Sequence, residues 1–169
     1  MPNALSTFGA IHTAISIVGV AVGFMALFQD GKIDPKSKNG KIYGVFTVLA
    51  CLSSFLVMKT GHLSSAHNLS ILILILLPIV YYAPSLRIFG GKADYVQTVG
   101  MTATLFFSLI PAVVETLTRL PVEQPFADGP DSPVVKTGLL SLVTIFAVIM
   151  IYQVVKLKKQ RKATLSPSM

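Results

Sequence analysis

Four side chains of this sequence could bind a metal ion or a haem group, those of His12, His62, His67 and Glu115. Imidazole and carboxylate groups are common ligands of iron, copper and zinc, and two imidazoles can hold the iron of a b-type haem. His12 and His67 belong to separate apolar segments, so they could face one another from two helices. Arg119 follows Glu115 by four residues and could bind a haem propionate.

The same residues also have simpler roles. Histidine at a membrane boundary can present its polar tip to neighbouring groups or water, and the spacing of Glu115 and Arg119 suits a salt bridge on one helix. Ser64 or Ser65 beside a metal would suit a hydrolase, but spacing alone does not bring a nucleophile within reach of a base. The sequence has no CxxCH or HExxH motif, and Cys51 is its single cysteine, which excludes covalently attached haem and a thiolate cluster.

The composition shows what kind of element must position these residues. Hydrophobic residues make up 53% of the 169-residue chain and charged residues only 12%, whereas ordinary soluble domains are about 25% charged. The net charge is +7, but the basic residues fall between and after apolar runs rather than across a polar surface. We therefore expect a protein embedded in the lipid bilayer, with no nucleic-acid partner.

Five apolar segments approach the roughly 20 residues that a helix needs to cross a bilayer. Gly, Pro and charged residues separate these segments, which cover residues 8–28, 42–58, 64–83, 95–115 and 134–155. The predicted fold is an all-α integral membrane bundle of five transmembrane helices, a single domain over residues 1–162 with a cytoplasmic tail over 163–169. Asp94 is expected to cap the fourth helix, and Ser132 before Pro133 suits the start of the fifth.

The distribution of Lys and Arg predicts an orientation. With the C-terminus in the cytoplasm, eleven basic residues lie inside and three outside, a strong positive-inside bias that places the N-terminus outside. The outer three are Lys59, Arg119 and Lys136. All three histidines and Glu115 then lie at the outer boundary of the membrane, where they could form one site.

Polar and small residues recur at helical spacing in three of the segments, and we expect these rows to face the bundle because lipid offers no hydrogen bonds. The rows are His12, Ser16, Gly19 and Gly23; Gly44, Thr47, Cys51, Ser54 and Met58; and Met101, Thr104, Ser108, Pro111, Glu115 and Arg119. The Gly19 and Gly23 pair would permit close helix approach. The third segment is apolar on every side after Ser70, which predicts much lipid contact, and the fifth is expected to be a packing helix.

The order of these features resembles a group of small bacterial multi-span membrane proteins that share a domain of unknown function. The segments that carry the resemblance are "IHTAISIVGVAVGF", "KNGKIYGVFTVLACLSSFLV", "AHNLSILILI" and "IPAVVETLTRLPVEQPF". The resemblance implies a helical bundle in a bacterial inner membrane. It implies no activity, cofactor or ligand.

Two functions follow as hypotheses. The first is a redox or metal-handling membrane protein in which His12, His62, His67 and Glu115 hold a transition metal, or His12 and His67 hold haem b with Arg119 nearby. The second is a non-catalytic subunit or assembly factor whose small-residue rows bind other membrane subunits or a second copy of the chain. A transporter is a weaker hypothesis, because five segments do not form an even inverted repeat and their interiors lack charges for ion coupling.

Overall fold

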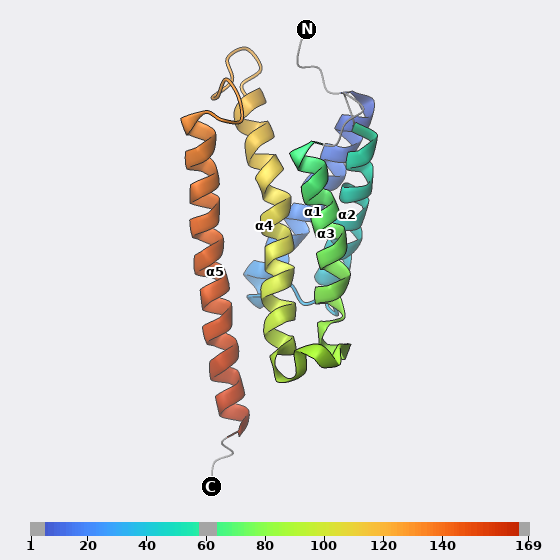
Figure 1. Ribbon diagram of the computed structural model, residues 1–169, viewed down its shortest axis with the longest axis vertical. Helices are drawn as coiled ribbons and strands as arrows, with labels where there is room; N and C mark the ends of the chain where they lie inside the picture. Colours follow the sequence, from blue (N-terminus) through green and yellow to red (C-terminus); the bar gives the residue numbers. More distant parts are fainter. Residues whose placement is uncertain (1–5, 58–63, 166–169) are drawn as a thin grey trace.

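The computed structural model describes residues 6–57 and 64–165, and these ranges form a helical bundle (Figure 1). The α-helices are α1 (Thr7–Asp30), α2 (Lys38–Ser54), α3 (Ser65–Tyr81), α4 (Ala93–Arg119) and α5 (Pro133–Leu165). Short 3-10 helices are η1 (Phe55–Val57), η2 (Ala83–Ser85) and η3 (Arg87–Lys92). The described residues contain no strand, so the predicted all-α class is confirmed.

Successive helices run in alternating directions, and the start of α1 and the end of α5 lie at opposite ends of the bundle (Figure 1). α1 packs along α2, α3 packs against both α2 and α4, and α5 packs along α4. The starts of α1 and α3 and the end of α2 therefore share one end of the bundle. The α1–α2 connection, the α3–α4 connection and the end of α5 lie toward the other end (Figure 1).

Four helical stretches are long and apolar enough to cross a membrane: Thr7–Asp30, Lys38–Val57, Arg87–Arg119 and Pro133–Ala163. These indicate a multi-pass membrane protein. α3 is apolar but has only 17 residues, which corresponds to about 25 Å of helix. Its bounds lie close to the predicted third segment.

Three helices are each preceded by a serine residue whose hydroxyl accepts a hydrogen bond from the first turn. Ser6 Oγ accepts from the Gly9 N–H at 3.1 Å, and Ser37 Oγ accepts from the Gly40 N–H at 3.0 Å. Ser132 Oγ accepts from the Val135 N–H at 3.3 Å, so the predicted start of the fifth helix is confirmed. Such caps satisfy backbone donors that have no partner within the helix.

The predicted cap at Asp94 is wrong. α4 begins at Ala93 with Lys92 at the capping position, so Asp94 lies inside the first turn. A capping residue normally has extended backbone, but η3 runs directly into α4 and keeps the chain helical through this point. Asp94 still suits its place, because a carboxylate in the first turn interacts favourably with the helix dipole.

α5 continues well beyond the predicted apolar segment, through the basic residues to Leu165. Lys, Arg and Gln are good helix formers, and neither Gly nor Pro interrupts the sequence between Gly138 and Pro167. The helix therefore carries the basic cluster directly from the end of its apolar part.

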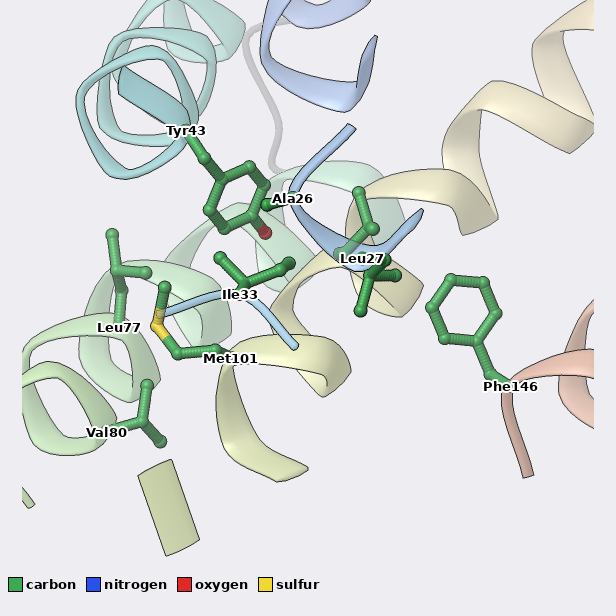
Figure 2. Close-up of a cluster of buried hydrophobic side chains, with 9 residues drawn as sticks. Ala26, Leu27, Ile33, Tyr43, Leu77, Val80, Met101 and Phe146 are labelled. Atoms are coloured by element: carbon green, nitrogen blue, oxygen red, sulfur yellow. The ribbon is translucent and has the colours of Figure 1, made fainter. Parts of the chain in front are cut away.

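The core lies where α1, α2, α3 and α4 meet, with one contribution from α5 (Figure 2). Tyr43 from α2, Met101 from α4 and Phe146 from α5 are among its fully buried side chains. The predicted close approach at the glycines of α1 is confirmed, because a Cβ on Gly23 would lie 2.9 Å from the ring of Tyr43. Ile73, Leu77 and Val80 are buried, so α3 also has one inward face in addition to its exposed apolar side chains.

Candidate functional site

His12 lies near the start of α1 and contacts the end of α2. Its Nδ1 is 3.0 Å from Ser53 Oγ, and the Ser53 hydroxyl in turn donates to the Ala50 carbonyl at 3.0 Å. Because a hydroxyl has one proton, Ser53 accepts from His12, which assigns the proton to Nδ1 of that ring. His12 thus links α1 to α2.

His67 lies in the first turn of α3 and is buried. Its Nδ1 accepts from the Ser64 N–H at 3.0 Å and lies 2.8 Å from Ser64 Oγ, while its Nε2 is 3.1 Å from the carbonyl oxygen of Ser54. A backbone N–H can only donate, so Nδ1 is unprotonated and Nε2 carries the proton that it donates to Ser54. The ring also packs against Phe55, with 5.7 Å between ring centroids.

The two histidines therefore bind consecutive residues of α2. His12 binds Ser53 and His67 binds Ser54, although they are 55 positions apart in the sequence. The Ser54 hydroxyl extends this cluster to α3, since it lies 2.9 Å from Ser70 Oγ. The structure thus brings together His12 and His67 at one end of the bundle, in an arrangement that joins α1, α2 and α3.

Glu115 and Arg119 form a salt bridge between Arg119 Nε and Glu115 Oε2 in the last turns of α4. The Glu115 side chain is 55% exposed and that of Arg119 is 29% exposed. This arrangement is the simpler of the two roles considered for the pair. It closes the end of the helix, as the i, i+4 spacing predicts.

The predicted metal and haem site stays a prediction. His62 lies outside the described residues. Within residues 6–57 and 64–165 no group of three or more His, Cys, Asp or Glu side chains is placed to share a metal ion. A metal ligated by His67 would have to replace the contact of one ring nitrogen with Ser64 or Ser54, because a ligating nitrogen must offer a free lone pair.

Further polar pairs, which sequence reasoning missed, link the other helices. Tyr43 Oη lies 2.8 Å from Thr104 Oγ1 and joins α2 to α4. Thr102 Oγ1 donates to Gln153 Oε1 at 3.0 Å, and Gln153 Nε2 donates to the Gly31 carbonyl at 3.0 Å. Gln153 is 2% exposed, so this amide ties α5 to α4 and to the α1–α2 connection.

The polar groups inside the bundle are satisfied within the chain. Among the described residues, no buried side-chain nitrogen or oxygen lacks a hydrogen-bond partner. Hydroxyls of Ser16, Ser108 and Thr118 donate to the carbonyl four positions earlier in their own helices. A bilayer interior offers no water to such groups, so internal pairing is what permits them there.

No protein-family model, no curated protein and no solved structure matches this chain. The geometry of its own residues is therefore the basis for a functional proposal.

Proposed function

We propose that this protein is a non-catalytic subunit of a larger membrane complex, and that its polar side chains hold its own helices together. The observation that carries the proposal is the use of His12 and His67 as helix links on consecutive residues of α2. Catalysis needs a nucleophile or ligand set with free lone pairs directed at one point. Here His12 Nδ1 and both ring nitrogens of His67 bind serine hydroxyls or backbone groups of the chain itself.

The proposal of partners within the membrane is supported by the small amount of chain outside the helices. The connection between α1 and α2 covers only residues 31–37, and at most 28% of the apolar stretch of each candidate membrane-spanning helix is buried within the single chain. Such a protein presents little surface to water and much to lipid or to other membrane helices. α5 presents an outward row of hydroxyl residues, Thr137, Ser141 and Thr144, and side chains of this kind are typical of contacts between membrane helices.

We further propose five spans, with the N-terminus outside and the C-terminus in the cytoplasm of a bacterial inner membrane. The alternating helix directions, with the start of α1 and the end of α5 at opposite ends of the bundle, fit an odd number of spans (Figure 1). The excess of Lys and Arg at the end that holds the C-terminus supports the orientation. α3 would complete the count as a short span whose polar first turn lies at the outer boundary.

The orientation can be tested by labelling single cysteines in intact cells with a membrane-impermeant maleimide. In a Cys51→Ala background, Asp128→Cys should be labelled before lysis, while Lys36→Cys and Ser85→Cys should be labelled only after it. The reverse pattern would overturn the orientation. Labelling of Asp128→Cys and Ser85→Cys on the same side would overturn the five-span arrangement.

The subunit role can be tested by extracting the full chain from its native membrane in mild detergent and separating the complexes on a native gel. We expect the chain to migrate in a complex larger than itself. Thr137→Leu, Ser141→Leu and Thr144→Leu combined should reduce that complex, and His12→Ala should leave it assembled. Migration as a single chain under all mild extraction conditions would contradict the proposal.

A further inference from the structure

A cavity of about 520 Å³ lies between α4 and α5 at the end of the bundle opposite to the histidines. Its lining includes Lys32 from the α1–α2 connection, Asp94 and Gln97 from α4, and Leu157 and Arg161 from α5. Elements far apart in the sequence thus place two cations around one hollow. The proposed subunit role does not use these residues.

Arg161 is held in place by two contacts. Its Nη1 donates to the Gly91 carbonyl, and its guanidinium lies over the ring of Tyr95, 5.5 Å from the centroid. The bond to Gly91 uses one of five N–H groups, so a guanidinium fixed in this way can still donate to a phosphate through other N–H groups. A fixed guanidinium loses less conformational freedom when it binds a ligand.

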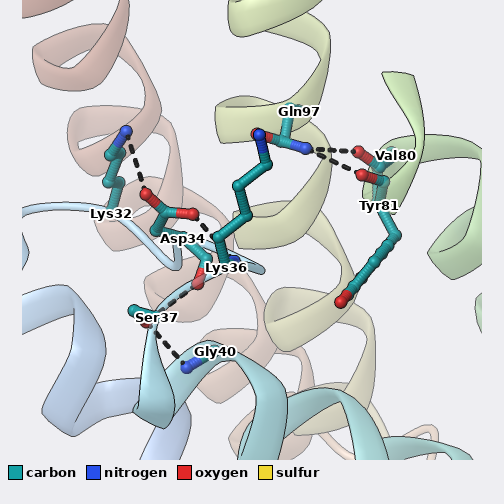
Figure 3. A network of polar contacts seen from close by, with 8 residues as sticks. All are labelled: Lys32, Asp34, Lys36, Ser37, Gly40, Val80, Tyr81 and Gln97. Atoms are coloured by element: carbon teal, nitrogen blue, oxygen red, sulfur yellow. Dashed lines mark hydrogen bonds and ion pairs between the residues drawn. The ribbon is translucent and has the colours of Figure 1, made fainter. Parts of the chain in front are cut away.

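The lining on the α4 side is also ordered (Figure 3). Gln97 Nε2 donates to the Val80 carbonyl at 3.3 Å and the Tyr81 carbonyl at 2.8 Å, which fixes the amide at the end of α3. The Lys32 ammonium lies 3.7 Å from Asp34 Oδ2 and is partly exposed. Such an exposed ion pair contributes little energy, so the ammonium can turn toward a second anion at small cost.

The position of the cavity along α5 favours a lipid over a soluble anion. The basic cluster begins at Lys156, directly after the apolar stretch. The preceding part of α5 has exposed apolar side chains, those of Ile151, Val154 and Val155. A second hollow of about 320 Å³ lies beside the first, lined by residues that include Tyr152, Val155 and Lys159. Phosphate contacts and acyl-chain contacts are therefore available within a few helical turns.

The charge of this end also fits an anionic ligand. Over residues 30–41, 82–94 and 156–162, this end holds eleven Lys and Arg residues and three acids, which are Asp30, Asp34 and Asp94. Basic pockets between membrane helices on the cytoplasmic side are typical binding sites for anionic headgroups. Asp94 is the one acid that lines the cavity and must weaken the binding of any anion there.

From this geometry we propose that the cavity binds the phosphate headgroup of an anionic phospholipid, with Lys32 and Arg161 as the phosphate ligands. The proposal rests on the membrane insertion proposed above but not on the subunit role. Failure of lipid binding with an unchanged cysteine labelling pattern would therefore remove the lipid site alone.

The test uses the purified full chain in detergent, titrated with phosphatidylglycerol or phosphatidylcholine of identical acyl chains and measured by native mass spectrometry. We expect retention of phosphatidylglycerol and at least tenfold weaker retention of phosphatidylcholine. Inorganic phosphate at millimolar concentration should not displace the lipid. Equal retention of the two lipids would overturn the proposal, and displacement by inorganic phosphate would assign the site to a free anion instead.

Two matched double variants distinguish lipid binding in the cavity from a general attraction of the lipid to the basic surface. Lys32→Gln with Arg161→Gln should weaken phosphatidylglycerol binding about thirtyfold, since each cation near a headgroup contributes roughly a fivefold change in affinity. Lys158→Gln with Lys162→Gln removes the same charge from exposed positions of α5 that do not line the cavity, and should weaken binding much less. Equal losses in the two variants would contradict a defined site.

Asp94→Asn should strengthen lipid binding instead of weakening it. This test remains available if the protein with Lys32→Gln and Arg161→Gln fails to fold. Removing this carboxylate from the lining should strengthen phosphatidylglycerol binding severalfold and leave phosphatidylcholine binding unchanged. Unchanged or weakened phosphatidylglycerol binding in folded Asp94→Asn protein would overturn the assignment of the cavity.

Discussion

The Nε2 atom of His67 lies 3.1 Å from the carbonyl oxygen of Ser54, in the last turn of α2. That carbonyl belongs to the end of a helix, where the last carbonyls have no partner within the helix. His67 supplies one, and at the same time its Nδ1 accepts from the backbone at the start of α3. One imidazole thus satisfies the end of one helix and the beginning of the next.

Replacing His67 by Ala should destabilise the protein by about 2 kcal/mol, because two hydrogen bonds of about 1 kcal/mol each are lost from a buried site. Asn68→Ala is the matched control, since Asn68 is exposed one position further along α3. The free energy of unfolding in mixed micelles measures both. A loss in His67→Ala no larger than that in Asn68→Ala would contradict the structural role of the imidazole.

Gly100 lies at a close approach of α3 to α4. A Cβ at this position would lie 2.2 Å from Cγ1 of Val80, whereas a Cβ on Gly44 would meet no atom within 4 Å. Gly100→Ala should therefore lower the free energy of unfolding by about 1–3 kcal/mol through overpacking. Gly44→Ala should be neutral or raise it by up to about 1 kcal/mol, because Ala favours helix. Similar effects of the two substitutions would show that α3 and α4 are further apart.

Gln153 is the buried amide that connects α5 to the rest of the bundle. Gln153→Leu should cost about 1 kcal/mol of unfolding free energy, in the range found for hydrogen bonds between membrane helices. Gln29→Leu is a suitable control, because its amide bonds the Asn39 side chain at an exposed site. Accelerated proteolysis between α4 and α5 should accompany the loss in Gln153→Leu only. Equal unfolding free energies of the two variants would show that the buried amide gives no net stabilisation.

Much of the fold could be predicted from the sequence, because bilayer thickness sets the length of apolar segments and Lys and Arg mark their boundaries. The rows of small and polar residues also predicted correctly which faces of α1 and α2 are buried. Gly19 and Gly23 are buried, as are Thr47 and Cys51. Helix ends were harder to place. Asp94 was misplaced because η3 leads directly into α4, so the backbone is already helical at Lys92, before the position where we expected the cap.

The candidate site could be predicted only in part. Counting charges placed His12 and His67 at one end of the bundle, where the structure has them. The sequence did not show that each ring would bind a neighbouring serine or carbonyl, because hydrogen-bond partners depend on the rotation of each helix about its own axis. The role of Gln153 was missed, although the sequence contains a signal for it. A lone amide inside the apolar stretch "IYQVVK" indicates a buried hydrogen-bond partner, because lipid offers none.

In the proposed role, the two histidines hold helices together and bind no cofactor. An absorption spectrum combined with elemental analysis of the full chain, purified in mild detergent from its native membrane, tests it most directly. We predict no Soret band and less than one transition-metal ion per chain. One haem or one metal ion per chain, lost in His12→Ala and His67→Ala but kept in Asn68→Ala, would contradict the claim and restore the redox or metal-handling hypothesis.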